Sequence, residues 1–270
     1  MSAVKHLGLG TWISIGDPVV TEIVSHLGFG WLLMDMEHGS LEPASLPDNL
    51  RACAGGGIFK IVRVGEPSAH LIGHVLDYGA DGIMVPHICD ASAAECVVKA
   101  MRYPPLGDRG FSTSVRAFKY GMDVPKDMAA YSSPLFMAQI ENYEGVTNAD
   151  SIAAVDGVDV LFVGPRDLGL DLSVRPKDRT YEFDDAVARV AAAALKHGKQ
   201  AGILVRNPDD IPKLRDMGFS ALALGSDMGM LKSGYASLLK KSRHYEKDGF
   251  TNGLVADYGL LGRSVRTSDR

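Results

Sequence analysis

The stretch DYGADGIMVP (residues 77–86) joins a helix-ending glycine to an apolar run, and this pattern decides the fold. The glycine suits the left-handed residue that closes a helix. The run after it is apolar on both faces, as a strand buried in a parallel sheet must be. The same pattern recurs in HLGFGWLLMD (26–35), AVDGVDVLFVG (154–164) and DMGFSALALG (216–225). The chain therefore repeats a unit that leads from a helix into a buried strand.

Four more apolar runs bring the number of predicted strands to eight: LGLGTWISI (7–15), FKIVRV (59–64), LFMAQIE (135–141) and QAGILV (200–205). Helices fit between nearly all of them. Asp17-Pro18 and Asn207-Pro208 each place an N-cap residue before a proline, Asp90 precedes a helical segment, and residues 182–198 form an Ala-rich amphipathic segment. Eight strands alternating with helices predict an α/β fold, a (β/α)8 TIM barrel, rather than an open doubly wound sheet.

The domain organisation follows from this count. We predict one barrel over residues 1–240 and a polar, Gly- and Ser-rich C-terminal tail over 241–270. The longest connection, 103–134, holds Pro104, Pro105 and three glycines. A loop of that length in a compact barrel is usually functional or interfacial.

Composition excludes several classes of protein. Lys and Arg number 28 against 33 Asp and Glu, a net charge of −5, so there is no basic excess to bind nucleic acid. Three cysteines are too few for a disulfide framework and fit a reducing compartment. The sequence has no apolar run long enough to span a membrane, and its N-terminus does not resemble a signal peptide. We therefore expect a cytoplasmic protein that binds neither nucleic acid nor membrane.

Titratable groups gather where the predicted strands end, which is where barrel enzymes place their chemistry. For any single residue, the alternative to a catalytic role is that it keeps the strand end soluble or forms a structural ion pair. No strand ends in lysine, since Lys60 begins its strand, so Schiff-base chemistry is not expected. Glu141 and Asp167 end neighbouring strands and are placed to hold one hard divalent cation, which would polarise a chelated 2-oxo acid. A proton-sharing or Arg-bridged structural pair is the alternative.

His38 is the best candidate for a general base, because Asp35 lies three residues before it and a carboxylate can orient the ring. It could instead cap the turn before Gly39, and His87 is the competing candidate. Arg63 has the fork geometry to bind a carboxylate in two places, or to act as a strut for Asp77 or Glu37.

Several longer strings resemble the HpcH/HpaI family of class II pyruvate aldolases. They include DMEHGSLE (35–42), IVRVGEP (61–67), LDYGADGIMVPHI (76–88), RYPPLGDRG (102–110) and QIENYEGVTNADSIAAVDGVDVLFVGPRDLG (139–169). The resemblance runs from about residue 7 to 235, and it implies a barrel of the phosphoenolpyruvate/pyruvate-binding type that cleaves or forms 4-hydroxy-2-oxo acids.

The resemblance also assigns roles to residues. It implies that Glu141 and Asp167 are the protein ligands of a divalent metal, magnesium or manganese, with cobalt and zinc as alternatives. His38 and Asp35 resemble the acid/base dyad that acts through water on the C4 hydroxyl, and Arg63 matches the arginine that stabilises the 2-oxo group. The pyruvate pocket is implied by the remaining matches: Gln139, Gly164, Pro165 and Arg166. Family members exchange the last helix between subunits, so the resemblance implies a homo-oligomer, a dimer of barrels assembled as a trimer of dimers.

The partners implied are a small 2-oxo acid and an aldehyde, and two stretches depart from the family pattern. Residues 168–173 read LGLDLS, and 114–133 match no well-known member, so both are expected to border the aldehyde half of the site. One alternative reaction is oxaloacetate decarboxylation followed by condensation of the enolate with another acceptor, as in a fungal relative. Cleavage of CoA thioesters is disfavoured because no basic nucleotide pocket is evident. A non-catalytic binding barrel is the alternative from a different class.

Overall fold

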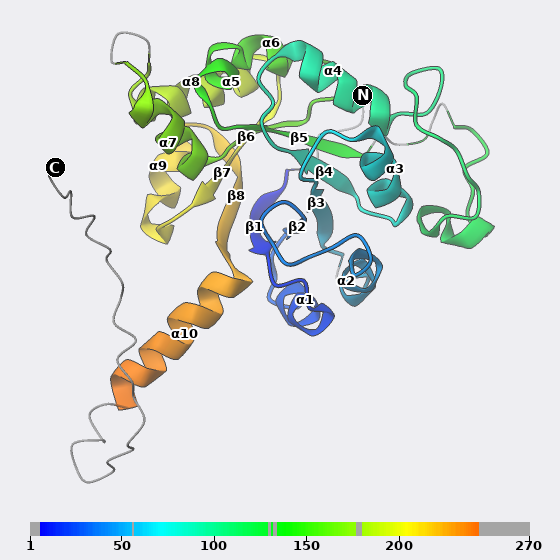
Figure 1. The fold of residues 1–270 in the computed structure, drawn as a ribbon, viewed down its shortest axis with the longest axis horizontal. Helices are drawn as coiled ribbons and strands as arrows, with labels where there is room; N and C mark the ends of the chain where they lie inside the picture. The colour runs from blue at the N-terminus through cyan, green and yellow to red at the C-terminus, as the bar shows by residue number, and fades with distance from the viewer. Residues whose placement is uncertain (1–5, 56, 129–130, 132–133, 177–179, 243–270) are drawn as a thin grey trace, which may run out of the picture. The chain divides into compact units, whose positions relative to one another are not determined.

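The computed structural model describes residues 6–55, 57–128, 131, 134–176 and 180–242. Its eight parallel strands form a closed barrel in sequence order, with β1 pairing both β2 and β8 (Figure 1). The predicted (β/α)8 barrel is therefore confirmed, and each predicted apolar run contains one strand. The strands are β1 (Gly8–Ile13), β2 (Trp31–Asp35), β3 (Phe59–Arg63), β4 (Gly82–Val85), β5 (Leu135–Ile140), β6 (Val160–Val163), β7 (Gln200–Val205) and β8 (Phe219–Ser226).

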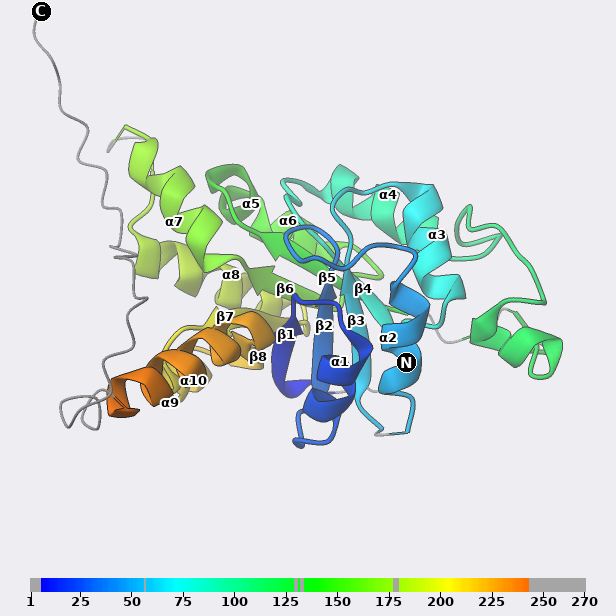
Figure 2. The same ribbon diagram turned by 60° about the horizontal axis from the view of Figure 1, so that its bottom comes forward.

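Helices follow the strands around the barrel, and Figures 1 and 2 both show α1 beside α2 and α3 beside α4. They are α1 (Pro18–Ser25), α2 (Leu46–Ala52), α3 (Ala69–Asp77), α4 (Ala91–Met101), α5 (Tyr143–Thr147), α6 (Ala149–Ala154), α7 (Pro165–Val174), α8 (Phe183–Lys196), α9 (Ile211–Asp216) and α10 (Asp227–Ser242). Asp17 and Asp90 cap α1 and α4 as predicted. Asn207 caps a short 3-10 turn (Pro208–Asp210) ahead of α9 instead of the helix itself.

The glycines of the repeated pattern have the left-handed backbone that the sequence predicts. Their φ angles are +89° at Gly28, +90° at Gly79, +108° at Gly157 and +94° at Gly218. In this region a side chain clashes with the backbone, so glycine is the residue of choice between a helix and the strand that follows.

Apolar side chains form two layers, one inside the barrel of strands and one outside it. The barrel interior is filled by Trp12, Trp31, Phe162 and their neighbours, with ring centroids 5.7 Å apart for Trp12 and Phe162. A larger layer packs between the strands and the helices, for example Leu32 and Val62 against Leu50 and Ile72. Side chains therefore alternate between the two layers along each strand, and only the strand ends remain for polar chemistry.

The long connection 103–134 lies at the rim where the strands begin, because it leads from α4 into β5. Arg109 Nη2 lies 2.6 Å from Asp77 Oδ1, and Arg116 Nη1 donates to the Tyr78 carbonyl at 2.6 Å. Both contacts are at the C-terminal end of α3, opposite the strand-end rim. The expectation that 114–133 borders the aldehyde half of the chain's own site is therefore wrong for the described part of that stretch.

The chain divides into two compact units, Met1–Met230 and Leu231–Arg270. Of the predicted tail 241–270, only residues 241 and 242 are among the described residues, and both belong to α10. Within the described ranges, no helix is long and apolar enough to cross a membrane.

Candidate active site

A cavity of about 510 Å³ opens at the rim where the strands end. Seven of the nine predicted site residues line it: His38, Arg63, Gln139, Gly164, Pro165, Arg166 and Asp167. The other two, Asp35 and Glu141, are buried, with exposed fractions of 2% and 4%. The fold thus brings residues from four different strands and their loops to one end of the barrel.

Asp35 and Arg63 form a buried, forked ion pair between neighbouring strands. They end β2 and β3 and stand opposite each other in the strand register. Arg63 donates from Nε to Asp35 Oδ1 at 2.9 Å and from Nη2 to Oδ2 at 2.7 Å. Its Nη1 lies 2.8 Å from Glu37 Oε2, and the Trp12 indole donates to Asp35 Oδ2 at 3.3 Å. Asp35 therefore holds the guanidinium through two N–H groups, and Glu37 adds an ion pair without a hydrogen bond, which leaves three N–H groups for a ligand.

The charge of Asp35 is stabilised by these contacts. Burial opposes ionisation, but the Arg63 guanidinium and the N–H groups of His38 and Glu37 outweigh it, so the pKa of Asp35 lies below its usual value. An ionised Asp35 thus keeps Arg63 in place throughout the neutral pH range.

His38 does not make the side-chain contact with Asp35 that the predicted dyad requires. Its backbone N–H donates to Asp35 Oδ1 at 3.2 Å, whereas its imidazole is 67% exposed with Nε2 3.9 Å from Glu37 Oε1. The oxygens of Asp35 are occupied by Arg63, Trp12 and two backbone N–H groups. In this structure Asp35 therefore orients the backbone of the loop that carries His38, and the ring faces the cavity without a carboxylate in hydrogen-bond contact.

Glu141 is a buried carboxylate with no lysine or arginine partner among the described residues. Gln139 donates to its Oε2 at 2.6 Å, and the backbone N–H of His87 donates to its Oε1 at 2.9 Å. Burial raises the pKa of Glu141, and the negative charges of Asp167 and Glu37 raise it further. The contacts with His87 lower the pKa but do not outweigh these effects. The site thus concentrates negative charge that a cation would stabilise.

These residues fit a divalent metal ion. The carboxylates of Glu141 and Asp167 are hard oxygen ligands, and Gln139 Oε1 is buried without a hydrogen-bond partner in the described part of the chain. No group of three or more His, Cys, Asp or Glu side chains arranged for a metal occurs within the described ranges. An ion held by two carboxylates would take its other ligands from water and substrate, as magnesium and manganese do.

Gly164 lets β6 approach Glu141 closely. A Cβ added at this position would lie 2.6 Å from Glu141 Oε2 and 2.9 Å from Gln139 Nε2. Any side chain here would push the carboxylate aside, so the glycine keeps Glu141 and the start of α7 in contact.

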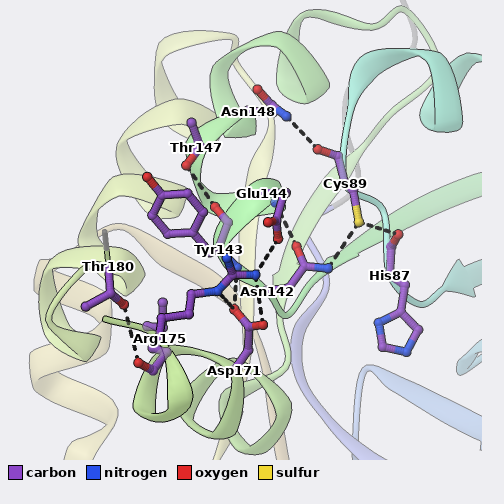
Figure 3. A network of polar contacts seen from close by, with 12 residues as sticks. His87, Cys89, Asn142, Tyr143, Glu144, Thr147, Asn148, Asp171, Arg175 and Thr180 are labelled. Carbon is purple, nitrogen blue, oxygen red and sulfur yellow. Dashed lines mark hydrogen bonds and ion pairs between the residues drawn. The ribbon is translucent and has the colours of Figure 1, made fainter. Parts of the chain in front are cut away.

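The loop after β4 supports Glu141 from the other side. His87 has a left-handed backbone with φ +54°, and Nδ1 of its 65%-exposed side chain lies 3.1 Å from Glu141 Oε1. The Cys89 thiol donates to the His87 carbonyl, and Asn142 Nδ2 donates to Cys89 Sγ at 3.1 Å (Figure 3). The strained residue is therefore held by contacts to the loop that follows Glu141.

Sequence reasoning missed the parts played by Trp12 and the His87 backbone, and the polar contacts of Asp171 and Arg175, whereas the Arg63–Glu37 ion pair was among the alternatives it left open. Trp12 lies near the end of the first predicted strand, and Asp171 precedes Arg175 by four residues. Strand-end position and helical spacing were the available signals, but the partners in each contact come from distant parts of the chain.

A protein-family model described as HpcH/HpaI aldolase/citrate lyase matches residues 9–233. The chain belongs to this family. The resemblance expected from the motifs is confirmed, and the family is one of carbon-carbon lyases.

Relatives of known name agree with this assignment. The chain is 35% identical over 232 residues to 5-keto-4-deoxy-D-glucarate aldolase of Klebsiella pneumoniae, covering 86% of this chain and 90% of that one. Among solved structures it is similar to an HpcH/HpaI family protein of Burkholderia cenocepacia, with a TM-score of 0.81, 31% identity and coverage of 88% and 95%. It is also similar to macrophomate synthase, with a TM-score of 0.78, 26% identity and coverage of 90% and 87%.

Proposed function

We propose that this chain is a metal-dependent pyruvate aldolase that reversibly cleaves a 4-hydroxy-2-oxo acid to pyruvate and an aldehyde. The observation that carries the proposal is the position of two carboxylates at the strand-end rim: Asp167 lines the 510 Å³ cavity, and the buried Glu141 lies behind Gly164, which also lines it. These two carboxylates would hold a divalent metal, magnesium or manganese, with cobalt and zinc as alternatives. Such an ion supplies Lewis acidity that polarises a bound 2-oxo acid.

The other residues of the cavity can act on the substrate directly. The backbone N–H groups of Arg166 and Asp167, in the first turn of α7, would bind the substrate carboxylate, because a helix N-terminus favours an anion. Gly164 and Pro165 shape this wall, and Gln139 presents its unpartnered Oε1 beside it.

Cleavage begins with removal of the proton on the C4 hydroxyl, and we assign this step to the exposed imidazole of His38, acting through an intervening water. The C3–C4 bond then breaks, its electron pair moves to the pyruvate enolate, and C4 leaves as the aldehyde carbonyl. Arg63, fixed by Asp35 and Glu37, stabilises the negative enolate oxygen with its remaining N–H groups until C3 is protonated.

The test measures pyruvate release from a panel of 4-hydroxy-2-oxo acids, with EDTA and after each metal is added back. We expect cleavage that EDTA abolishes and magnesium or manganese restores, and no metal-dependent cleavage by Glu141→Gln. Full metal-dependent turnover by Glu141→Gln would refute the site assignment.

Oxaloacetate decarboxylation with condensation of the enolate on another acceptor is the second candidate. The similarity to macrophomate synthase favours it, since this reaction needs only the pyruvate half of the site. The same assay separates the two, because in this case oxaloacetate alone would lose CO2 in a metal-dependent way while the panel stays uncleaved.

We further propose a cytoplasmic homo-oligomer, a dimer of barrels assembled as a trimer of dimers by exchange of the last helix. Cys53, Cys89 and Cys96 are unpaired, which suits a reducing compartment. In α10, helical spacing gathers Leu231, Tyr235 and Leu238 on one face, and an apolar face of this kind needs a partner surface. Sedimentation should give six times the chain mass of 28.9 kDa.

A further inference from the structure

Helix α7 carries Asp167 in its first turn, yet it has few apolar anchors. Of its ten residues only Pro165, Leu168 and Leu172 are buried, while Leu170 and Val174 are exposed. Packing against the barrel alone therefore fixes this helix only along a narrow stripe, and other contacts must set its position.

Asp171, one turn after Asp167, supplies the first of these contacts. Its Oδ2 accepts the backbone N–H of Tyr143 at 2.8 Å. Tyr143 begins α5 and stands two residues after Glu141. A single carboxylate thus joins the helix that carries one predicted metal ligand to the loop that carries the other.

Arg175, the residue that follows the last residue of α7, completes the contact. It donates from Nε to Asp171 Oδ2 at 2.8 Å and from Nη2 to Oδ1 at 3.0 Å, and the same Nη2 donates to Glu144 Oε2 at 2.8 Å. Its guanidinium carbon lies 4.9 Å from the centre of the Tyr143 ring (Figure 3). The fork is bidentate and stacked, an arrangement that lysine cannot reproduce.

The Tyr143 ring has a second aromatic contact. Its ring stacks on Tyr181 with centroids 5.1 Å apart and an interplanar angle of 26°. Burial raises the pKa of Asp171, but the Arg175 guanidinium and the Tyr143 N–H outweigh it, so the pKa lies below its usual value and the pair stays ionised at neutral pH. The attraction between the Asp171 carboxylate and the Arg175 guanidinium is therefore present at neutral pH.

We propose that Asp171 and Arg175 are positioning residues that clamp α7 onto Tyr143 and so set the separation of the Asp167 and Glu141 carboxylates for one metal ion. This inference rests on the proposed function, because it takes these two carboxylates as the ligands. Asp171 lies in the stretch 168–173, which departs from the family pattern.

The experiment compares Mn²⁺ affinity, by titration calorimetry of the full-length chain, with thermal unfolding in EDTA. Asp171→Asn keeps the side-chain shape but removes the charge that Arg175 grips. We expect the Mn²⁺ dissociation constant to rise about 10- to 100-fold, the usual effect of losing a contact that orients a metal ligand. Arg175→Lys should give an intermediate value, since it keeps the charge and loses the fork.

Asp150→Asn is the matched control. Asp150 is also a helical carboxylate, held by Lys196 Nζ at 2.7 Å and by the imidazole of His197 at 3.2 Å, and it lies outside the cavity lining. Its loss should lower the unfolding temperature to a similar degree while Mn²⁺ affinity stays at the wild-type value.

Each outcome separates this inference from the proposed function. If the wild-type chain binds Mn²⁺ and Glu141→Gln does not, the metal site stands; wild-type affinity in Asp171→Asn and Arg175→Lys would then show that the clamp has only a structural role and overturn the inference. Absence of Mn²⁺ binding by the wild-type chain would overturn both. Should Asp171→Asn not fold, Arg175→Lys decides by itself.

Discussion

At the scale of single residues, the candidate site depends on close contacts that leave no spare volume. Gly164 is the clearest case, because the Glu141 carboxylate occupies the space where a side chain would be. The backbone φ of Gly164 is −89°, which any residue can adopt. The requirement for glycine here is therefore steric, and a single methyl group tests it.

Gly164→Ala should reduce kcat/KM for pyruvate release about 10- to 100-fold, because the new Cβ displaces Glu141 and Gln139. Gly169→Ala, five residues further along α7, is the control. Its Cβ would meet only Phe183 ring carbons at 3.9 Å, and replacing a helical glycine should stabilise the fold by about 0.4–1 kcal/mol. Steady-state kinetics and chemical unfolding of both variants give the comparison. Equal kcat/KM values for the two variants would contradict the steric requirement for glycine at position 164.

Glu141 should weaken the metal-free protein at neutral pH. Its folded-state pKa is raised, so its favourable contribution is complete below the unfolded value of 4.5 and is lost as the pH rises through the folded value. In EDTA, Glu141→Gln should therefore unfold at a higher temperature than the wild type at pH 7, and the difference should shrink toward pH 4. Added Mn²⁺ should stabilise the wild type but not the variant. A variant less stable than the wild type at pH 7 in EDTA would contradict the assigned shift.

At the scale of elements, the helix-to-strand turns carry the repeat that builds the barrel. Gly28 and Gly157 have the same left-handed backbone but different surroundings. A Cβ at Gly28 would meet nothing within 4 Å, whereas one at Gly157 would lie 2.8 Å from both Val98 Cγ1 and Arg102 Nη2. A substitution at Gly28 therefore tests backbone strain by itself. A substitution at Gly157 tests the same strain together with the packing of α4 against the turn before β6.

Gly28→Ala should cost about 1–2 kcal/mol of unfolding free energy, the penalty for a side chain in left-handed backbone. Gly157→Ala should cost more, because Val98 and Arg102 must also move. Urea unfolding of the two variants measures the difference. Equal losses of unfolding free energy in the two variants would mean that α4 can move away from the new side chain without lowering stability.

The fold was predictable because buried parallel strands are apolar on both faces and their helices end at glycines. The strand-end residues of the site were predictable for the same reason. The contacts between them were not predictable, because they depend on the register of distant strands and loops. Examples are the hydrogen bonds of Asp35 to Arg63 instead of the His38 ring, and the hydrogen bond from the His87 N–H to Glu141. Asp171 and Arg175 have helical spacing, but their target Tyr143 lies 28 residues away from Asp171.

At the scale of the whole molecule, the barrel separates stability from chemistry. The interior around Trp31 and Leu33 is apolar and fully buried, and the connection 103–134 is anchored at the rim where the strands begin. The predicted site residues gather at the opposite rim, where Arg63 joins β2 to β3 and Asp227 accepts N–H groups of Ser14 and Ile15. Substitutions at the first rim should therefore change unfolding free energy with little effect on KM.

The two tryptophans of the chain allow this division to be followed by intrinsic fluorescence. Trp31 is fully buried and bonded to the Gly8 carbonyl, whereas Trp12 lines the cavity, with the Arg63 guanidinium 5.3 Å from its ring. Intrinsic fluorescence should therefore contain one constant emitter and one that is quenched when a 2-oxo acid enters beside Arg63. Trp12→Phe should leave a spectrum that no longer responds to pyruvate, so occupancy of the site can be followed without any label.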